Sequence, residues 1–86
     1  MTNKEIKELM EENSDLTFKG DNALEGLKIF AKYFPSNTVI TGANHDIIYS
    51  VAVDDIAEAG ITKEEVLRLR KELNWHIENS CFACFV

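Results

Sequence analysis

Two cysteines and two histidines are the side chains of this sequence with the widest chemical repertoire. Cys81 and Cys84 form a CxxC pattern, which can serve thiol–disulfide exchange or supply half of a zinc site. Residues three apart on a strand point to opposite faces, and this pair lies in a segment that we predict to be a strand. Zinc would also require His45 and His76, whose spacing matches no standard zinc motif. We therefore interpret both cysteines as small buried side chains. A metal- or ligand-binding site made of these four residues is the alternative.

The same residues offer little support for catalysis. His45 and Asp46 are adjacent, and neighbouring residues on a strand point apart, so the carboxylate cannot orient the imidazole. A hydrogen bond of Asp46 to the backbone of a turn is the simpler interpretation. A nucleophilic pair of either cysteine with His76 lacks a loop that would hold it. We expect a protein that is not an enzyme and needs no cofactor.

Acidic residues are the most informative feature of the sequence. The chain has 15 Asp and Glu against 9 Lys and Arg, a net charge of −6, and it has no Lys or Arg between Tyr33 and Thr62. That stretch holds four acidic residues and the N-terminal helix a second group, so the full set is Asp46, Asp54, Asp55 and Glu58 with Glu8, Glu11, Glu12 and Asp15. Together they predict a negative surface that docks on a basic groove of a protein partner. The alternative is a solvated surface that only confers solubility.

Length and composition restrict the setting. The 86 residues fit one domain that spans 1–86. The charged N-terminal segment lacks the apolar core of a signal peptide, and no apolar run approaches the ~20 residues needed to span a bilayer. We expect a cytoplasmic protein that has no membrane contact and keeps its cysteines reduced. Direct nucleic-acid binding is not expected, because the net negative charge of the protein repels phosphate backbones.

Helical periodicity and capping patterns predict the helices. An amphipathic helix at 3–13 starts with a capping box, and we expect the N-terminal region 1–15 to lie at the periphery of the domain. A longer helix, capped by Asn22 and ended by Pro35, has an apolar stripe of Leu24, Leu27, Phe30, Ala31 and Phe34. The remaining helical segments are a short turn that Asp54 and Asp55 cap and that Gly60 closes, and a helix at 63–73.

β-Branched and aromatic residues predict the strands. A short strand at 38–41 and a longer one at 46–52 are separated by the segment 42–44. In the longer strand, one face is Ile47, Tyr49 and Val51, and the other is Ile48, Ser50 and Ala52. The second face is only partly apolar, so we expect that something covers it incompletely.

The last thirteen residues, 74–86, alternate as a β-hairpin around Asn79 and Ser80. A two-residue turn there pairs Ile77 with Phe82. The chain therefore has an α+β fold, with a small three- to four-stranded antiparallel sheet, two or three helices packed mainly on one face, and a C-terminal β-hairpin.

Aromatic residues in the hairpin exceed what one face of a small sheet needs. Trp75, Phe82 and Phe85 are crowded into it. Either helices cover both faces of the sheet, or one face meets a partner. A homodimer through the terminal strands is the simplest version.

Several segments together resemble a family of small, uncharacterised accessory proteins of bacteriophages and prophages. The likeness covers about residues 24–86, leaves out the first helix, and rests on His45–Tyr49, Gly60–Glu65, Leu73–Trp75 and Cys81–Val86. These motifs are structural in type and carry no catalytic assignment. The resemblance implies a phage or mobile-element protein that binds and modulates a bacterial host or defence protein, such as an anti-defence inhibitor in the host cytosol.

Overall fold

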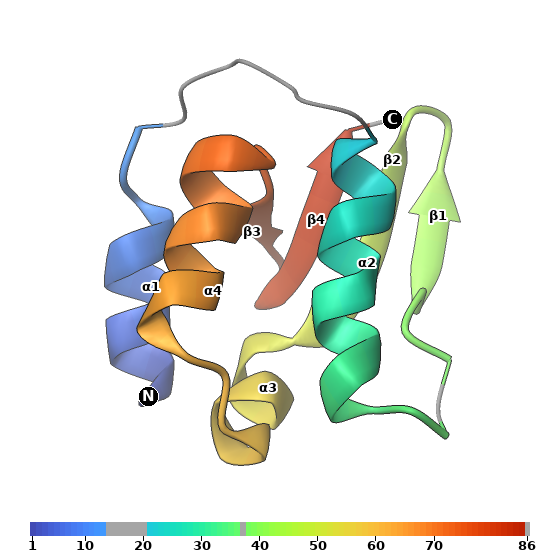
Figure 1. Cartoon of the computed structure of the whole chain (residues 1–86). Helices are drawn as coiled ribbons and strands as arrows, with labels where there is room; N and C mark the ends of the chain where they lie inside the picture. The colour runs from blue at the N-terminus through green and yellow to red at the C-terminus, as the bar shows by residue number, and fades with distance from the viewer. Residues whose placement is uncertain (14–20, 37, 86) are drawn as a thin grey trace.

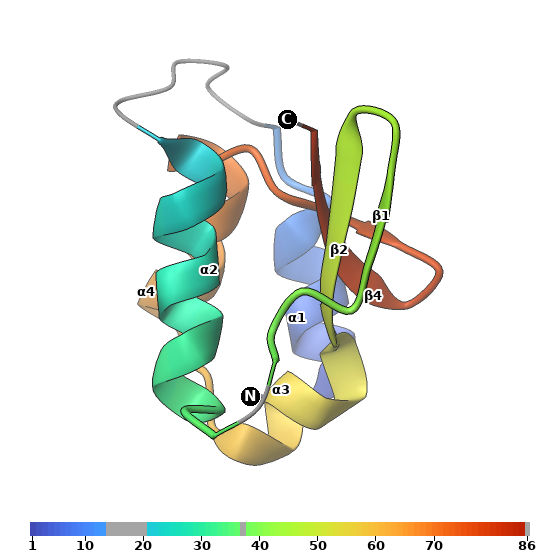
Figure 2. The same ribbon diagram turned by 90° about the vertical axis from the view of Figure 1, so that its right-hand side faces the viewer.

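A computed structural model describes residues 1–13, 21–36 and 38–85 and shows a four-stranded antiparallel sheet covered by helices. The strands, in the spatial order β1-β2-β4-β3, are β1 (Gly42–Asn44), β2 (Ile47–Ala52), β4 (Cys81–Phe85) and β3 (His76–Glu78). The helices are α1 (Asn3–Met10), α2 (Asn22–Tyr33), α3 (Val53–Ala59), α4 (Lys63–Leu67) and the π-helical continuation η1 (Arg68–Glu72). Figures 1 and 2 show α2 and α4 on one face of the sheet. The predicted α+β class and the C-terminal hairpin are confirmed, with four α-helices in the described ranges instead of two or three.

Three aromatic rings form the centre of the core. Phe30 of α2 lies edge-on to Trp75 with ring centroids 5.2 Å apart, and its ring is 4.9 Å from that of Phe82 on β4. All three side chains are fully buried. Ile6 and Met10 of α1 are buried in the same cluster, so α1 is part of the core and not a peripheral addition. None of the helices in the described residues combines the length and apolar character that crossing a membrane requires.

The buried face of α2 differs from the predicted apolar stripe. Gly26, Ile29 and Phe30 are buried, whereas Leu24 is 48% exposed and Ala31 is exposed. The helix turns its glycine toward the sheet because Trp75 packs there, and a Cβ at position 26 would lie 2.1 Å from the indole Nε1. The sequence pattern missed this contact because a glycine carries no apolar signal.

The cap of α2 also differs from the prediction. Asp21 is the N-cap residue, and its carboxylate accepts a hydrogen bond from the Leu24 backbone N–H. Asn22, the predicted cap, instead points inward and its side-chain amide donates to the backbone oxygen of Leu73 and to Sγ of Cys84. The Asn22 side chain therefore joins the start of α2 to the C-terminal part of the fold.

The first strand lies later in the chain than predicted. β1 is Gly42–Asn44, and His45 with Asp46 forms the two-residue turn into β2. This turn fixes the register, because it pairs Asn44 with Ile47. The predicted strand at 38–41 runs beside β2 without regular pairing. Val39 and Thr41 hydrogen-bond to Ser50, and Thr41 also bonds to Tyr49.

The C-terminal hairpin has the predicted register. Ile77 pairs with Phe82, and both turn residues, Asn79 and Ser80, have positive φ as a two-residue type I′ turn requires. The apolar terminal strand β4 lies inside the sheet, between β2 and β3. Val86 lies outside the described residues.

The last helix and its neighbour depart from the predictions in detail. α3 ends as expected at Gly60, whose φ is 98°, but its N-cap is Ala52, and Asp54 and Asp55 lie in its first turn without capping it. The predicted helix at 63–73 begins with the expected capping box and then changes to π-helical hydrogen bonding in η1. There the Leu73 N–H donates to the backbone oxygen of Arg68, five residues earlier, at 3.0 Å.

Candidate functional site

Helix α1 presents a row of glutamates to solvent. The Thr2 hydroxyl accepts from the Glu5 N–H while the Glu5 carboxylate accepts from the Thr2 N–H, and these two bonds fix the start of the helix. The backbone hydrogen bond from Thr2, followed by the one with its side chain, lowers the pKa of Glu5. Because Ile6 and Met10 are buried, the helical period turns the acidic residues outward, and the exposed ones are Glu5, Glu8, Glu11 and Glu12. Asp15, the last member of the predicted acidic group, lies outside the described residues.

Helix α3 presents the second part of the acidic set. Its Val53 and Ile56 are fully buried, so Asp54, Asp55 and Glu58 are exposed on the opposite side. These three residues line an open hollow of about 600 Å³, whose other wall is the N-terminal end of α1. The N-terminal end of α1 and the carboxylates of α3, about fifty residues apart in the sequence, therefore meet in this hollow.

The hollows along α1 continue this surface. Met1 lines both the hollow against α3 and a second one of about 320 Å³ that includes Glu8 and Glu12. Glu8 and Glu12 also line a third hollow of about 330 Å³ with Glu11. α1 and α3 pack against each other. We call the surface of Glu8, Glu11, Glu12, Asp54, Asp55 and Glu58 the acidic surface. Its neighbours include Lys63, which lines the second hollow.

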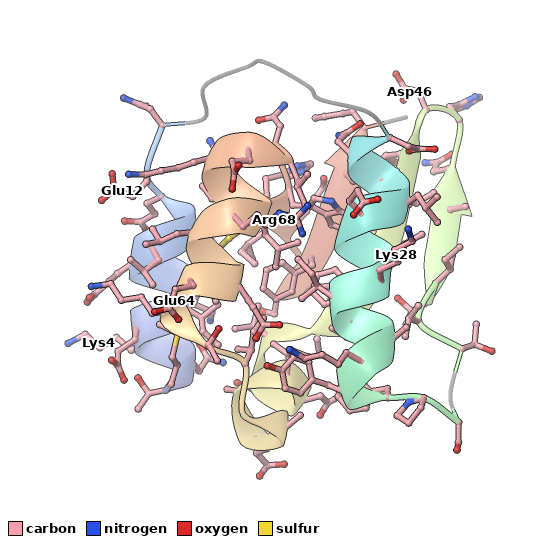
Figure 3. All side chains as sticks on the ribbon, viewed as in Figure 1. Lys4, Glu12, Lys28, Asp46, Glu64 and Arg68 are labelled. Atoms are coloured by element: carbon pink, nitrogen blue, oxygen red, sulfur yellow. The ribbon has the colours of Figure 1, made fainter. Side chains whose placement is uncertain are left out.

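Asp46 is not part of the acidic surface. It occupies the turn between β1 and β2, whereas α3 follows the opposite end of β2. The six residues of β2 separate Asp46 from α3 by roughly 20 Å. Figure 3 shows Asp46 and Glu12 on opposite sides of the molecule. The structure therefore places six of the predicted acidic residues on, or next to the end of, two helices that pack together, and it leaves this one apart.

The cysteines and histidines of the alternative site are not gathered. In the described residues, no group of three or more His, Cys, Asp and Glu is placed to hold a metal ion. Cys84 is fully buried beside Asn22. Burial, and then the charge of Asp21, raises the pKa of its thiol to about 11, despite the hydrogen bond from Asn22. Cys81 is half-buried, and both cysteines are free thiols.

A row of side chains on the outer face of the sheet makes contacts that the sequence did not predict. The Tyr49 hydroxyl donates to the Glu78 carboxylate at 3.3 Å, and the same carboxylate lies 3.2 Å from Nε2 of His76. The His76 ring stacks on Phe85 at 5.0 Å. Burial, and then the Glu78 carboxylate, raises the pKa of Tyr49. These four residues come from three strands, and Ala83 beneath them is fully buried. We call them the outer-face row.

The outer-face row corrects the predicted faces of β2. The face of Ile48 and Ser50 was expected to be incompletely covered, but Ser50 is fully buried and Ile48 packs against the core. The face of Tyr49 is the one that no helix of the described residues covers (Figure 2). Val51 joins the core because the pairing with β4 shifts between Tyr49 and Ala52.

A second missed feature is the set of contacts around Glu65. Its carboxylate caps α4 through Thr62, and it also accepts a 2.7 Å bond from Nζ of Lys32 and a bond from the Tyr33 hydroxyl. Burial alone would raise the pKa of Glu65, but the hydrogen bonds from Lys32, Tyr33 and Thr62 outweigh it and lower the pKa to about 2. This carboxylate joins α2 to α4. The capping role of Glu65 was predictable from the sequence, but its contacts with α2 were not, because no local pattern relates it to residues over thirty positions earlier.

Comparisons with family models, with curated proteins and with solved structures found no match for this chain.

Proposed function

We propose that this protein is a non-enzymatic binding module that uses its acidic surface to dock on a basic surface of another protein. The observation that carries this proposal is the meeting of α1 and α3, which places carboxylates from two distant segments around adjoining hollows. A surface with an excess of one charge sign, here carboxylates over Lys63, accelerates association with an oppositely charged partner and disfavours like-charged ones. The helices that carry these carboxylates are anchored in the core by Ile6, Val53 and Ile56, so the surface is preorganised.

The kind of partner follows from the resemblance to phage and prophage accessory proteins. That resemblance supports a bacterial host or defence protein as the target, with anti-defence inhibition as the consequence. The net charge of −6 supports a basic target over another acidic protein. A partner whose natural ligand is nucleic acid would meet this requirement, because its binding groove is basic.

The test is affinity capture from bacterial lysate with a tagged protein, followed by mass spectrometry of what co-purifies. The decisive variant reverses two charges of the acidic surface, Asp54→Lys with Glu58→Lys. Its matched control, Asp46→Lys with Glu72→Lys, reverses two exposed charges outside that surface. Circular dichroism of both variants checks that they remain folded.

We expect a single stoichiometric partner that the control retains and the decisive variant binds at least about tenfold more weakly, a loss of about 1.4 kcal/mol. The affinity should also fall as salt is added, because exposed charges are screened. Equal retention of the partner by both variants would remove the acidic surface from the proposal.

A further inference from the structure

A smaller pocket adjoins the acidic surface at the first turn of α3. Its volume is about 270 Å³. Its lining combines apolar side chains, those of Phe34, Val51 and Ala52, with polar ones, those of Thr41, Asp55 and Cys81. Its lining residues come from the end of α2 and the segment after it, and from the first turn of α3. The pocket lies where these segments meet the ends of β2 and β4.

Asp55 connects the pocket to the acidic surface. This residue lines both the 270 Å³ pocket and the 600 Å³ hollow between α1 and α3. It is also the one charged side chain among the described residues that line the pocket. The pocket therefore combines apolar residues with one carboxylate that it shares with the hollow between α1 and α3.

The polar groups of the pocket favour a hydrogen-bond donor. The Thr41 hydroxyl donates its proton to the backbone oxygen of Ser50 at 2.8 Å, so its oxygen is left as an acceptor. The ionised Asp55 carboxylate offers only acceptors. An apolar wall beside a carboxylate matches a side chain that has an aliphatic stem and a cationic end. Lysine and arginine have that form, and buried arginine anchors are frequent at the centres of protein interfaces.

We propose that this pocket receives one lysine or arginine side chain of the protein partner. The stem packs on Phe34, Val51 and Ala52, and the cationic group pairs with Asp55. This inference rests on the proposed function and deepens it, because it assigns the position of an anchor residue within the acidic surface.

The experiment is a titration of ¹⁵N-labelled protein followed by two-dimensional NMR, with N-acetyl-arginine methylamide and N-acetyl-lysine methylamide as probes. We expect saturable shifts at Thr41, Val51, Ala52 and Asp55 with at least one probe, at a dissociation constant of about 1 mM or weaker because a single side chain makes few contacts. The neutral isostere N-acetyl-citrulline methylamide should leave these signals in place. Asp55→Asn should weaken binding at least about fivefold, and Asp46→Asn, which changes an exposed aspartate outside the pocket, should not.

Cys81 offers a second, independent test, because this residue lines the pocket and is partly exposed while Cys84 is buried. Methyl methanethiosulfonate converts the Cys81 thiolate into a methyl disulfide and releases methanesulfinate, which adds bulk to the wall. We expect the modified protein to lose binding of the cationic probe. Cys81→Ala, treated in the same way, should retain it.

The outcomes separate this inference from the proposed function. Equal shifts with the arginine and citrulline probes, or no change on Asp55→Asn, would overturn the anchor pocket. Hexalysine peptide then tests the acidic surface alone. Shifts on α1 and α3 with hexalysine, but none in the pocket with either single-residue probe, would refute the pocket and leave the proposed function standing. No response to hexalysine would count against both.

Discussion

The helix-covered face of the sheet and its outer face are completed by different means. On the covered face, Phe30 and Trp75 pack on Phe82 of β4, and all three are removed from solvent. On the outer face, Tyr49, Glu78, His76 and Phe85 form the outer-face row above Ala83. The covered face depends on apolar contact between elements, whereas the outer face depends on hydrogen bonds and ring stacking among strands.

The outer face of the sheet is covered in a way that the number of aromatic residues did not predict. Their number suggested that either helices cover both faces or one face meets a partner. The structure has a third arrangement, in which the long polar side chains of the outer face cover the small residue between them. Phe85, 59% exposed, is the large apolar residue left open there. Single exposed apolar residues are common on soluble proteins, so this face does not by itself require a partner.

Substitution of two glycines, one on each face, should give the largest difference in the free energy of unfolding. A Cβ at Gly26 would lie 2.1 Å from Trp75 Nε1, whereas a Cβ at Gly42 would lie 3.6 Å from the nearest atom of Tyr49, an ordinary contact. Gly26→Ala should therefore lower the free energy of unfolding by about 3 kcal/mol or more, because the indole must leave its place. Gly42→Ala should change it by less than about 1 kcal/mol. Urea unfolding measures both, and similar losses for the two variants would contradict the different packing of the faces.

An intermediate effect is expected where the helices above the covered face are joined. Glu65→Gln should cost roughly 1–3 kcal/mol at neutral pH, since it weakens charge-assisted bonds to Lys32 and Tyr33. The folded pKa of about 2 lies below the unfolded value of 4.5. The stabilisation by Glu65 is therefore fully present above pH 4.5 and is lost as the pH falls toward 2.

Unfolding of Glu65→Gln and the parent protein at several pH values tests this. The gap in stability between them should narrow between pH 4.5 and 2. Glu64→Gln, at an exposed neighbouring position, is the matched control and should show no such narrowing. A gap that stays constant with pH would mean that Glu65 acts through packing alone.

A smaller effect is expected in the outer-face row. Tyr49→Phe removes the hydroxyl that donates to Glu78 and keeps the ring, so it should cost less than about 1 kcal/mol. Thermal unfolding measures this change. A loss comparable to that of Gly26→Ala would show that the outer face stabilises the fold as strongly as the core does.

The last comparison concerns the reactivity of the two thiols and involves no change in stability. Cys81 and Cys84 are three residues apart on β4, and only Cys84 points to the covered face beside Asn22. With its pKa raised to about 11 and its side chain buried, Cys84 should react with Ellman's reagent only after unfolding. Cys81 should react in the folded protein. Fast reaction of two thiols without denaturant would contradict the burial of Cys84.

The sequence predicted those parts of the fold whose signals are local. The capping boxes at Thr2 and Thr62, the end of α3 at Gly60 and the hairpin turn at Asn79 all depend on residues within five positions of one another. Hydrogen bonds and φ preferences at such short range need no tertiary partner. These features could therefore be predicted from the sequence without knowledge of the tertiary packing.

The parts that the sequence could not decide depend on contacts between distant segments. Gly26 faces the core because the Trp75 side chain packs against it. Glu65 links α2 to α4 because it binds Lys32 of α2. For the candidate site, the sequence predicted one surface of all the acidic residues, whereas the structure packs α1 on α3 but leaves Asp46 a strand length away. Charge and periodicity determine which side chains face water. Only the packing of helices on the sheet determines which of them become neighbours.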